Sequence, residues 1–361
     1  MVKLTRRAAL AGTGAFIFAN PLAHAKGRTL HLFAGTSAKG LGIFPLDLDT
    51  GTGDMTVGNP HTSIKAPGYG ATAHGLHYLV NQAANRLMVF GADWSLKADI
   101  AAPDRNPCHI ALDATRSWLS VPHYSGNTFA LWRLDAKGMP QNPPTLVHDE
   151  GSGPNLERQK SPHPHWTGFS PDNKLFYTVD LGNDTVMVAP FDPAGGIGPR
   201  IVAYKGEPGE GPRQLGFQPR LPLVYQLAEM GSAVTSLRRA ADGTLTRLQR
   251  LSTLPDGYSG INNAAHIAVN RAGTRVYASN RGHNSIAVFE AGPNGKLNRL
   301  QLISSGGNWP RFFLLLEEYG LMLVANQYSG EIALFRIGRN GLLTPAGKQA
   351  IVVEATYIGL A

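Results

Sequence analysis

The chain has 361 residues, and its 33 Lys and Arg residues outnumber 25 Asp and Glu residues to give a formal net charge of +8. Its single cysteine, Cys108, excludes internal disulfides, CxxCH haem sites and Cys-based zinc sites, and the sequence contains no Walker or GxGxxG nucleotide-binding loop. The Lys and Arg residues are spread along the chain and form no cluster. We therefore expect small anionic molecules rather than nucleic acid as partners.

The first predicted element is an export signal. Residues 5–10 (TRRAAL) form a twin-arginine pattern, which is followed by an apolar run over residues 8–19 and a small-x-small cleavage site at residues 23–25. The apolar run is too short and too rich in glycine to span a bilayer, although a retained N-terminal anchor is the alternative. We therefore predict that residues 1–25 are a twin-arginine (Tat) signal read by the Tat export machinery. The mature protein would then be periplasmic or secreted, with no membrane anchor.

The clearest internal pattern is four short strands separated by turns between Thr167 and Lys205. Residues 167–170, 175–180, 185–192 and 200–205 are rich in β-branched and aromatic residues, and the turns between them carry Pro-Asp, Gly-Asn-Asp and Gly-Gly. This is the pattern of one four-stranded antiparallel blade.

Similar sequence patterns recur along the chain at intervals of about 42 to 57 residues. The third strand of each copy is marked by Ile43, Leu87, Phe129, Val186, Val234, Ile286 and Ile332. The repeat predicts an all-β fold in which residues 26–361 form a single seven-bladed β-propeller with four-stranded antiparallel blades. The Pro-, Gly- and Ser-rich stretch 142–160 is expected to be a long loop that serves the site. The run Ala350–Glu354 is expected to pair with an N-terminal strand and close the ring.

Propeller geometry turns this repeat into a prediction of the site. The first strand of a blade lines the channel and successive strands alternate in direction, so the start of strand one and the end of strand two share one face. The first of these positions, the start of strand one, which we call the first slot, is occupied by Cys108, His165, Arg213, Ala265 and Arg311. The second slot, the end of strand two, is occupied by Ala38, Gln82, Tyr124, Leu181, Glu229, Arg281 and Gln327. Titratable side chains from blades four to seven are therefore predicted to converge on one mouth of the channel.

The same positions carry a family likeness. The motifs are residues 161–165 (SPHPH), 211–213 (GPR), 228–229 (AE), 278–286 (ASNRGHNSI), 310–311 (PR) and 325–327 (ANQ). From about Leu30 to Arg336 the chain resembles the seven-bladed lactonase family, which includes propeller-type 6-phosphogluconolactonases and fungal muconate lactonising enzymes. The chain departs from the family's usual pattern at Gln214, Ala228, His266 and Ala268, which predicts an altered substrate-facing rim.

The resemblance implies a site without metal or cofactor, in which His165, Glu229, Arg213 and Arg281 handle a lactone and its carboxylate. The implied function is an exported lactonase that hydrolyses a sugar-derived (aldono-) lactone, such as gluconolactone or 6-phosphogluconolactone, to the hydroxy acid. Export favours an unphosphorylated substrate. The alternatives are a non-catalytic periplasmic propeller that binds a ligand or protein, and a lactonising cycloisomerase of the muconate type.

Hydrolysis needs a base for water and donors for the oxyanion. Either His165 or Glu229 is a candidate base, and Arg213 and Arg281 are candidate oxyanion or carboxylate partners. The alternative is that Glu229 and Arg281 form a structural ion pair. The predicted substrate-binding residues are Arg311, Gln327, Tyr124, His109 and Gln82.

The sequence also contains an HxH pair, His163 and His165, which is a pattern that metal sites use. His109, His123 and His266 would be possible neighbours. Because no carboxylate cluster accompanies them, we predict no metal.

Overall fold

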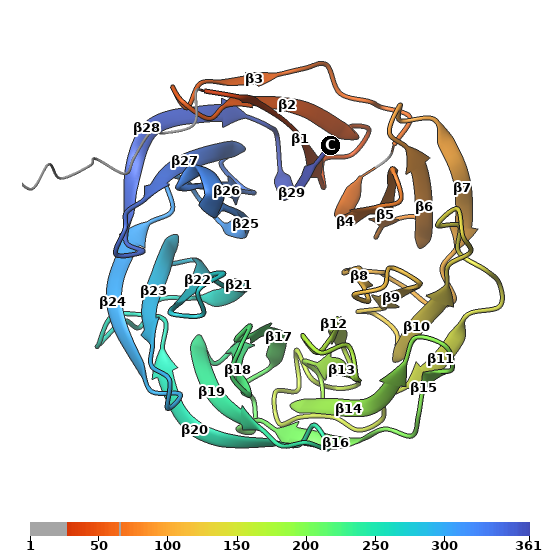
Figure 1. The fold of residues 1–361 in the computed structure, drawn as a ribbon. Helices are drawn as coiled ribbons and strands as arrows, with labels where there is room; N and C mark the ends of the chain where they lie inside the picture. Colours follow the sequence, from red (N-terminus) through yellow and green to blue (C-terminus); the bar gives the residue numbers. More distant parts are fainter. Residues whose placement is uncertain (1–26, 65) are drawn as a thin grey trace, which may run out of the picture.

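The computed structural model describes residues 27–361 except residue 65, and the predicted export signal lies outside the described residues. The described chain forms seven antiparallel sheets arranged in a ring about a central axis (Figure 1), with a 3-10 turn, η1 (Glu317–Tyr319), between two strands. The predicted seven-bladed propeller is therefore confirmed. Within the described ranges, no helix is long and apolar enough to cross a membrane.

The strands of each blade follow one another from the channel to the outer rim. Blade one contains β29 (Ala355–Leu360), β1 (Thr29–Thr36), β2 (Ile43–Asp49) and β3 (Met55–Val57). Blade two contains β4 (Pro67–Ala73), β5 (Leu76–Asn81), β6 (Arg86–Gly91) and β7 (Leu96–Ala101). Blade three contains β8 (Ala111–Leu112), β9 (Trp118–Pro122), β10 (Thr128–Arg133) and β11 (Thr145–His148). Blade four contains β12 (Pro164–Phe169), β13 (Leu175–Asp180) and β14 (Thr185–Asp192), with β15 (Gly196–Ile197) and β16 (Ile201–Lys205) both paired to β14.

The remaining three blades have four strands each. Blade five contains β17 (Pro212–Phe217), β18 (Leu223–Ala228), β19 (Ala233–Arg239) and β20 (Leu245–Ser252). Blade six contains β21 (Asn263–Val269), β22 (Arg275–Arg281), β23 (Ser285–Ala291) and β24 (Leu297–Ser304). Blade seven contains β25 (Pro310–Leu316), β26 (Leu321–Asn326), β27 (Glu331–Ile337) and β28 (Leu343–Ile351). All seven predicted marker residues lie in the third strand of their blade, so the register of the repeat was predicted correctly.

The ring is closed by the C-terminal strand, but by a different segment from the one predicted. Ala350 belongs to β28 and pairs with Ile332 in blade seven. The chain then turns through Glu354, whose φ is 48°, and β29 pairs antiparallel with β1 from Leu32↔Leu360 onward. The expected closure through residues 350–354 is wrong because that run completes blade seven and its turn. Residues 355–360 form the inner strand of blade one.

A repeated hydrogen bond connects neighbouring blades. The hydroxyl of Tyr78 in blade two donates to the carbonyl of Gly138 in blade three at 2.7 Å. Tyr177 and Tyr277 make the same bond to Gly243 and Gly341 of the next blade, each at 2.8 Å. The three glycines have φ between 77° and 89°, a region that glycine enters without a Cβ penalty. A tyrosine on the second strand and a glycine in the following blade's outer turn therefore act together to fix the spacing of blades.

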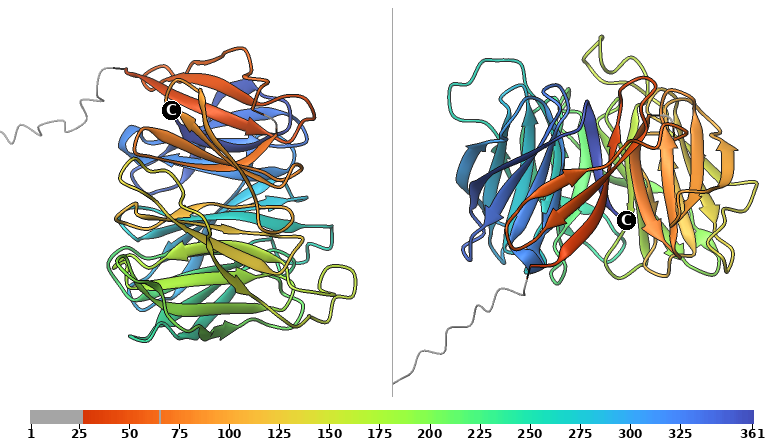
Figure 2. Two further views of the ribbon diagram at one scale, coloured as in Figure 1. Left: turned by 90° about the vertical axis from the view of Figure 1, so that its right-hand side faces the viewer. Right: turned by 90° about the horizontal axis from the view of Figure 1, so that it is seen from above.

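The predicted long loop at residues 142–160 is correct in part. Residues 145–148 of this stretch form β11, the outer strand of blade three, and the loop itself runs over residues 149–163. Another long connection, over residues 253–262 between β20 and β21, projects from the same face of the disc in the right view of Figure 2. That face is the one on which the predicted site residues lie.

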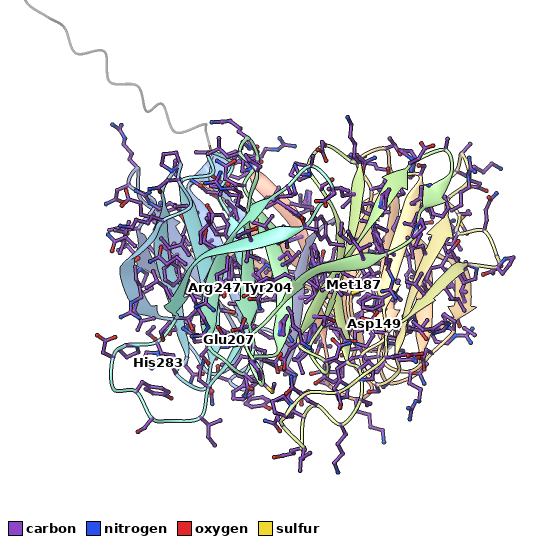
Figure 3. All side chains as sticks on the ribbon, turned by 90° about the horizontal axis from the view of Figure 1, so that it is seen from below. Asp149, Met187, Tyr204, Glu207, Arg247 and His283 are labelled. Carbon is purple, nitrogen blue, oxygen red and sulfur yellow. The ribbon has the colours of Figure 1, made fainter. Side chains whose placement is uncertain are left out.

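Two buried carboxyl groups, Asp149 and Asp180, lie close together where the loop over residues 149–163 joins the blades. Asp180 ends β13, and its Oδ1 accepts hydrogen bonds from the backbone N–H groups of His163 (2.9 Å) and Gly182 (2.7 Å). Asp149, labelled in Figure 3, follows β11, and its Oδ1 accepts a bond from Arg200 at 2.7 Å. Burial, together with the neighbouring Asp149 carboxylate, raises the pKa of Asp180 to about 8. The raised pKa favours the protonated form of Asp180 at neutral pH. The equivalent residue in blades two, six and seven is an asparagine.

We expect Asp180→Asn to raise the melting temperature at pH 8. Folded Asp180 keeps its proton up to about pH 8, whereas the unfolded chain loses that proton near pH 4. The unfolded state therefore binds fewer protons across this window, and the stability of the wild type falls as pH rises through it. The asparagine keeps the acceptor oxygen, supplies an N–H donor toward Asp149 and does not titrate.

Thermal unfolding at pH 4.5 and pH 8 would test this prediction. The advantage of the variant should be present at pH 8 and shrink at pH 4.5, while exposed Asp256→Asn should show no such dependence. A lower melting temperature of Asp180→Asn at pH 8 would contradict the protonation state assigned to this pair.

Candidate active site

Three of the five residues predicted at the start of an inner strand share one backbone feature. The inner strands β12, β17 and β25 each begin with a Pro-X pair, namely Pro164-His165, Pro212-Arg213 and Pro310-Arg311. In each case the pairing register shifts between the proline and the residue after X, which leaves X unpaired in a β-bulge. A bulge re-aims the side chain of the extra residue, and proline tolerates this position because it has no N–H to pair. The Pro-X bulge therefore aims His165, Arg213 and Arg311 at the channel.

These side chains border a cavity of about 220 Å³ at the channel mouth. The cavity is lined by Gln82, Asn106, Cys108, Tyr124, Arg158, His165, Arg213, Glu229, Arg281 and Arg311. Seven of the nine residues predicted for the site thus lie in one cavity, although they come from blades two to seven.

The other two predicted residues lie elsewhere. His109 lines a smaller chamber of about 30 Å³ deeper in the channel, together with Tyr69 and His266. Gln327 donates from Nε2 to the hydroxyl of Ser37 at 2.9 Å and does not line the larger cavity. The Gln327 N–H bonds the Trp309 carbonyl as the Glu229 N–H bonds the Gly211 carbonyl, so the two residues are equivalent in the repeat, but the side chain of Gln327 is bonded to blade one.

Glu229 is the centre of the site. It follows β18, is 4% exposed and contacts three guanidinium groups. Its Oε2 lies 2.7 Å from Arg213 Nη1 and 3.0 Å from Arg281 Nη2, while its Oε1 accepts a bond from Arg158 Nη2 at 2.8 Å. The ion pair between Glu229 and Arg281 that the structural alternative required is present. However, Glu229 is shared among three cations rather than matched to one.

His165 adjoins this cluster. Its Nε2 lies 3.7 Å from Glu229 Oε2 and accepts a hydrogen bond from Arg213. Burial and the positive charge of Arg213 hold the pKa of His165 well below its usual range, so the imidazole is neutral. Burial alone would raise the pKa of Glu229, but Arg281 and Arg213 hold it well below its usual range. The site therefore contains an ionised carboxylate beside a neutral imidazole.

Arg311 differs from the other arginines of the cavity. Among the described residues, it is the one cavity arginine whose side chain makes no hydrogen bond or ion pair with the protein. Burial and the nearby Arg213 cation lower its pKa. A partly buried cation without a partner is unfavourable, and an anionic ligand would offset its desolvation. The cavity holds four arginines and one carboxylate, so its charge favours binding of an anion.

Arg158 was missed by the sequence analysis, although it belongs to the stretch predicted to serve the site. It also donates to the hydroxyl of Tyr124 at 3.1 Å, and its side chain remains 32% exposed. The neighbouring Gln159 is fully buried and its Nε2 donates to the Leu181 carbonyl and to Asp184 Oδ1, each at 2.8 Å. This buried anchor holds the loop so that Arg158 reaches into the cavity. A polar residue anchored inside a loop leaves no periodic signal in a sequence.

The HxH pair does not form a metal centre with its predicted neighbours. His163 Nδ1 donates to the Tyr124 carbonyl at 2.8 Å, and its ring stacks on that tyrosine at 4.8 Å between centroids. The ring of His165 meets the same tyrosine edge-on at 5.2 Å. Across residues 27–64 and 66–361, no group of three or more His, Cys, Asp or Glu side chains is arranged to hold a metal ion.

Comparisons with known proteins agree with this architecture. Residues 31–359 match the family described as "Lactonase, 7-bladed beta-propeller". The chain belongs to this lactonase family. A "6-phosphogluconolactonase" of Bacillus subtilis is 31% identical over 242 residues, which cover 66% of this chain and 68% of the relative. The family resemblance inferred from the channel-mouth motifs is therefore confirmed.

Solved structures show the same fold for this lactonase-family protein. A crystal structure of a Lactobacillus plantarum protein superposes with a TM-score of 0.85 at 28% identity, and covers 92% of this chain and 100% of its own. The periplasmic gluconolactonase of Pseudomonas aeruginosa superposes with a TM-score of 0.82 at 23% identity, and covers 92% and 99% respectively. At that lower identity, the likeness concerns the fold alone.

Proposed function

We propose that the protein is a lactone hydrolase that opens a sugar-derived lactone, such as gluconolactone or 6-phosphogluconolactone, to the hydroxy acid. Membership of the lactonase family and the likeness to a 6-phosphogluconolactonase support the reaction class. The observation that carries the proposal is the charge of the cavity, in which four arginines surround one carboxylate and Arg311 has no protein partner among the described residues. Lactone hydrolysis develops an oxyanion and ends in a carboxylate, and these arginines would stabilise both.

In the proposed reaction, His165 takes a proton from water as the water oxygen bonds to the lactone carbonyl carbon. The bond between that carbon and the ring oxygen then breaks, and the imidazolium returns the proton to the ring oxygen. Glu229, 3.7 Å from His165 Nε2, would stabilise the transient imidazolium. We assign the base to His165 because both oxygens of Glu229 are already bonded to guanidinium groups.

Substrate binding would also prepare His165 for this role. In the free protein, burial and Arg213 depress the pKa of His165. A developing oxyanion or a substrate anion against Arg213 would offset its positive charge and draw its N–H away from His165 Nε2. The proton affinity of His165 would therefore rise when substrate is in place.

We expect the purified protein to hydrolyse at least one of glucono-1,5-lactone, 6-phosphogluconolactone and muconolactone faster than the spontaneous rate, measured by acid release at constant pH. His165→Ala should lower kcat/KM by about 100-fold or more, because it removes the proton-transfer group. His31→Ala is the matched control, since His31 is exposed on β1 and bonds Asp47.

Each outcome bears on the alternatives. No hydrolysis of any lactone above background would overturn the proposal. Formation of a lactone from the open acid, with no hydrolysis, would favour the cycloisomerase. Binding of a lactone without turnover above background would favour a binding protein. Unchanged hydrolysis in His165→Ala would remove His165 from the role of base.

A further inference from the structure

A tryptophan at the rim of the site has an unfavourable backbone conformation. Trp309 lies between β24 and β25, immediately before Pro310, and its φ is 70°. Left-handed conformations cost a residue with a side chain about 1 kcal/mol or more, and a following proline further disfavours helical backbone angles. The same position has φ 63° at Gly211 in blade five, 61° at Asn106 in blade three and 42° at Ala66 in blade two. Glycine and asparagine suit this conformation, whereas tryptophan does not.

Two neighbouring blades hold Trp309 in place. Its backbone N–H donates to Asn284 Oδ1 in the β22–β23 turn at 2.9 Å. Its carbonyl accepts a bond from the Gln327 N–H at 2.9 Å. The ring of Tyr328, which follows β26, stacks on the indole at 4.6 Å between centroids and 16° between planes. The conformation is thus determined by contacts on both sides of the blade six–blade seven junction.

The indole also lies against the catalytic cluster. Arg281 Cζ is 5.6 Å from the centroid of the Trp309 ring, within the range of a cation–π contact. The same guanidinium is 3.0 Å from Glu229 Oε2, and Arg281 Nε donates to the Asn263 carbonyl at 3.1 Å. Tyr328, Trp309, Arg281 and Glu229 therefore form a continuous series of contacts from the exposed rim to the buried carboxylate. Tyr328 is 62% exposed at its outer end.

We propose that Trp309 is a positioning residue that holds the Arg281 guanidinium against Glu229, with Tyr328 as its support. A residue that keeps an unfavourable backbone conformation, at a position where glycine would avoid the strain, indicates a functional constraint. The expected change in kcat/KM rests on the proposed lactone hydrolysis. The expected displacement of Arg281 in a crystal structure does not depend on it.

The test compares Trp309→Gly with Trp309→Phe and with Trp94→Gly. Trp94 also has a left-handed backbone, with φ 61°, but it stacks on His77 at 4.2 Å and lies outside the cavity. Both glycine variants remove an indole and relieve the same backbone strain. We expect kcat/KM on the best lactone to fall about 10-fold or more in Trp309→Gly, mostly through kcat, with partial recovery in Trp309→Phe. Trp94→Gly should retain the wild-type kcat/KM per folded molecule.

The pH profile and a crystal structure give readouts that a purely structural role would not change. Since Arg281 lowers the pKa of Glu229, a displaced Arg281 should shift the acid limb of the kcat/KM profile to higher pH in Trp309→Gly. A crystal structure of this variant should show Arg281 displaced from Glu229, whether or not any lactone is turned over.

Two outcomes would overturn the inference: an Arg281 that keeps its contact with Glu229 in Trp309→Gly, or equal loss of kcat/KM in the Trp309 and Trp94 glycine variants. If Trp309→Gly fails to fold, Tyr328→Ala replaces it. That variant removes the support from an exposed position and should displace Arg281 in the same direction.

Discussion

Glu229→Gln is expected to lower kcat/KM for lactone hydrolysis by about 100- to 10,000-fold. The amide leaves the shape of the side chain intact but removes the negative charge that would stabilise a protonated His165, 3.7 Å away. It also leaves Arg158, Arg213 and Arg281 without their shared carboxylate. Breaking a buried ion pair from one side costs about 3–5 kcal/mol, so the melting temperature should fall as well.

The stability effect has a pH signature. The folded-state pKa of Glu229 lies well below the usual range, so the stability that its ionised form contributes is present above the unfolded-state pKa near 4. That contribution is lost as pH falls toward the folded-state pKa. The gap in melting temperature between the wild type and Glu229→Gln should therefore be widest at neutral pH and narrow below about pH 4.

Steady-state kinetics and thermal scans from pH 3 to pH 8 would check this prediction. Glu290→Gln, at an exposed position on β23, is the matched control and should change neither quantity. Retention of near wild-type kcat/KM in Glu229→Gln would remove Glu229 from the catalytic cluster and leave it as a structural partner of the arginines.

Deletion of residues 355–361 is expected to prevent the chain from reaching a stable fold. The deletion removes β29, the inner strand of blade one, and exposes the edge of β1 from Leu32 to Thr36. It also removes Ile358, which is fully buried, and Tyr357, whose ring packs against Tyr69 at 4.6 Å. An unpaired, apolar strand edge promotes aggregation, so the truncated protein should be largely insoluble.

Soluble yield and size-exclusion chromatography would measure this effect. Deletion of Ala361 alone is the control, because it removes one backbone hydrogen bond to His31 and leaves β29 intact. A monomeric truncated protein with an unchanged melting temperature would show that the ring does not depend on this strand.

The repeat explains why so much of the site was predictable. A propeller places equivalent positions of each blade at equivalent heights in the channel. Alignment of the seven copies of the repeat therefore predicted the positions of His165, Arg213, Glu229, Arg281 and Arg311. The closing strand was misplaced by a few residues because residues 350–354 and 355–360 both read as strands. The turn at Glu354 that separates them depends on a left-handed backbone angle.

The features that sequence reasoning missed lie outside the repeat. Arg158 reaches the cavity because Gln159 is buried under its loop, and this is a tertiary contact with no counterpart in the repeat pattern. Trp309 occupies a slot that is glycine in blade five, so the alignment gave no reason to expect an aromatic contact with Arg281. Side-chain direction also escaped prediction at Gln327, which shares its slot with Arg281 yet bonds to Ser37 of blade one.

The Pro-X bulge gives the propeller a set of equivalent sockets around one channel. The proline fixes the backbone while the residue after it faces inward, and blades four, five and seven fill this socket with His165, Arg213 and Arg311. Because the scaffold around each socket is similar, the chemistry of one position can change with little change to the blade that carries it. New substrate preferences can therefore arise within this fold by exchange of single residues, while the ring of sheets keeps its geometry.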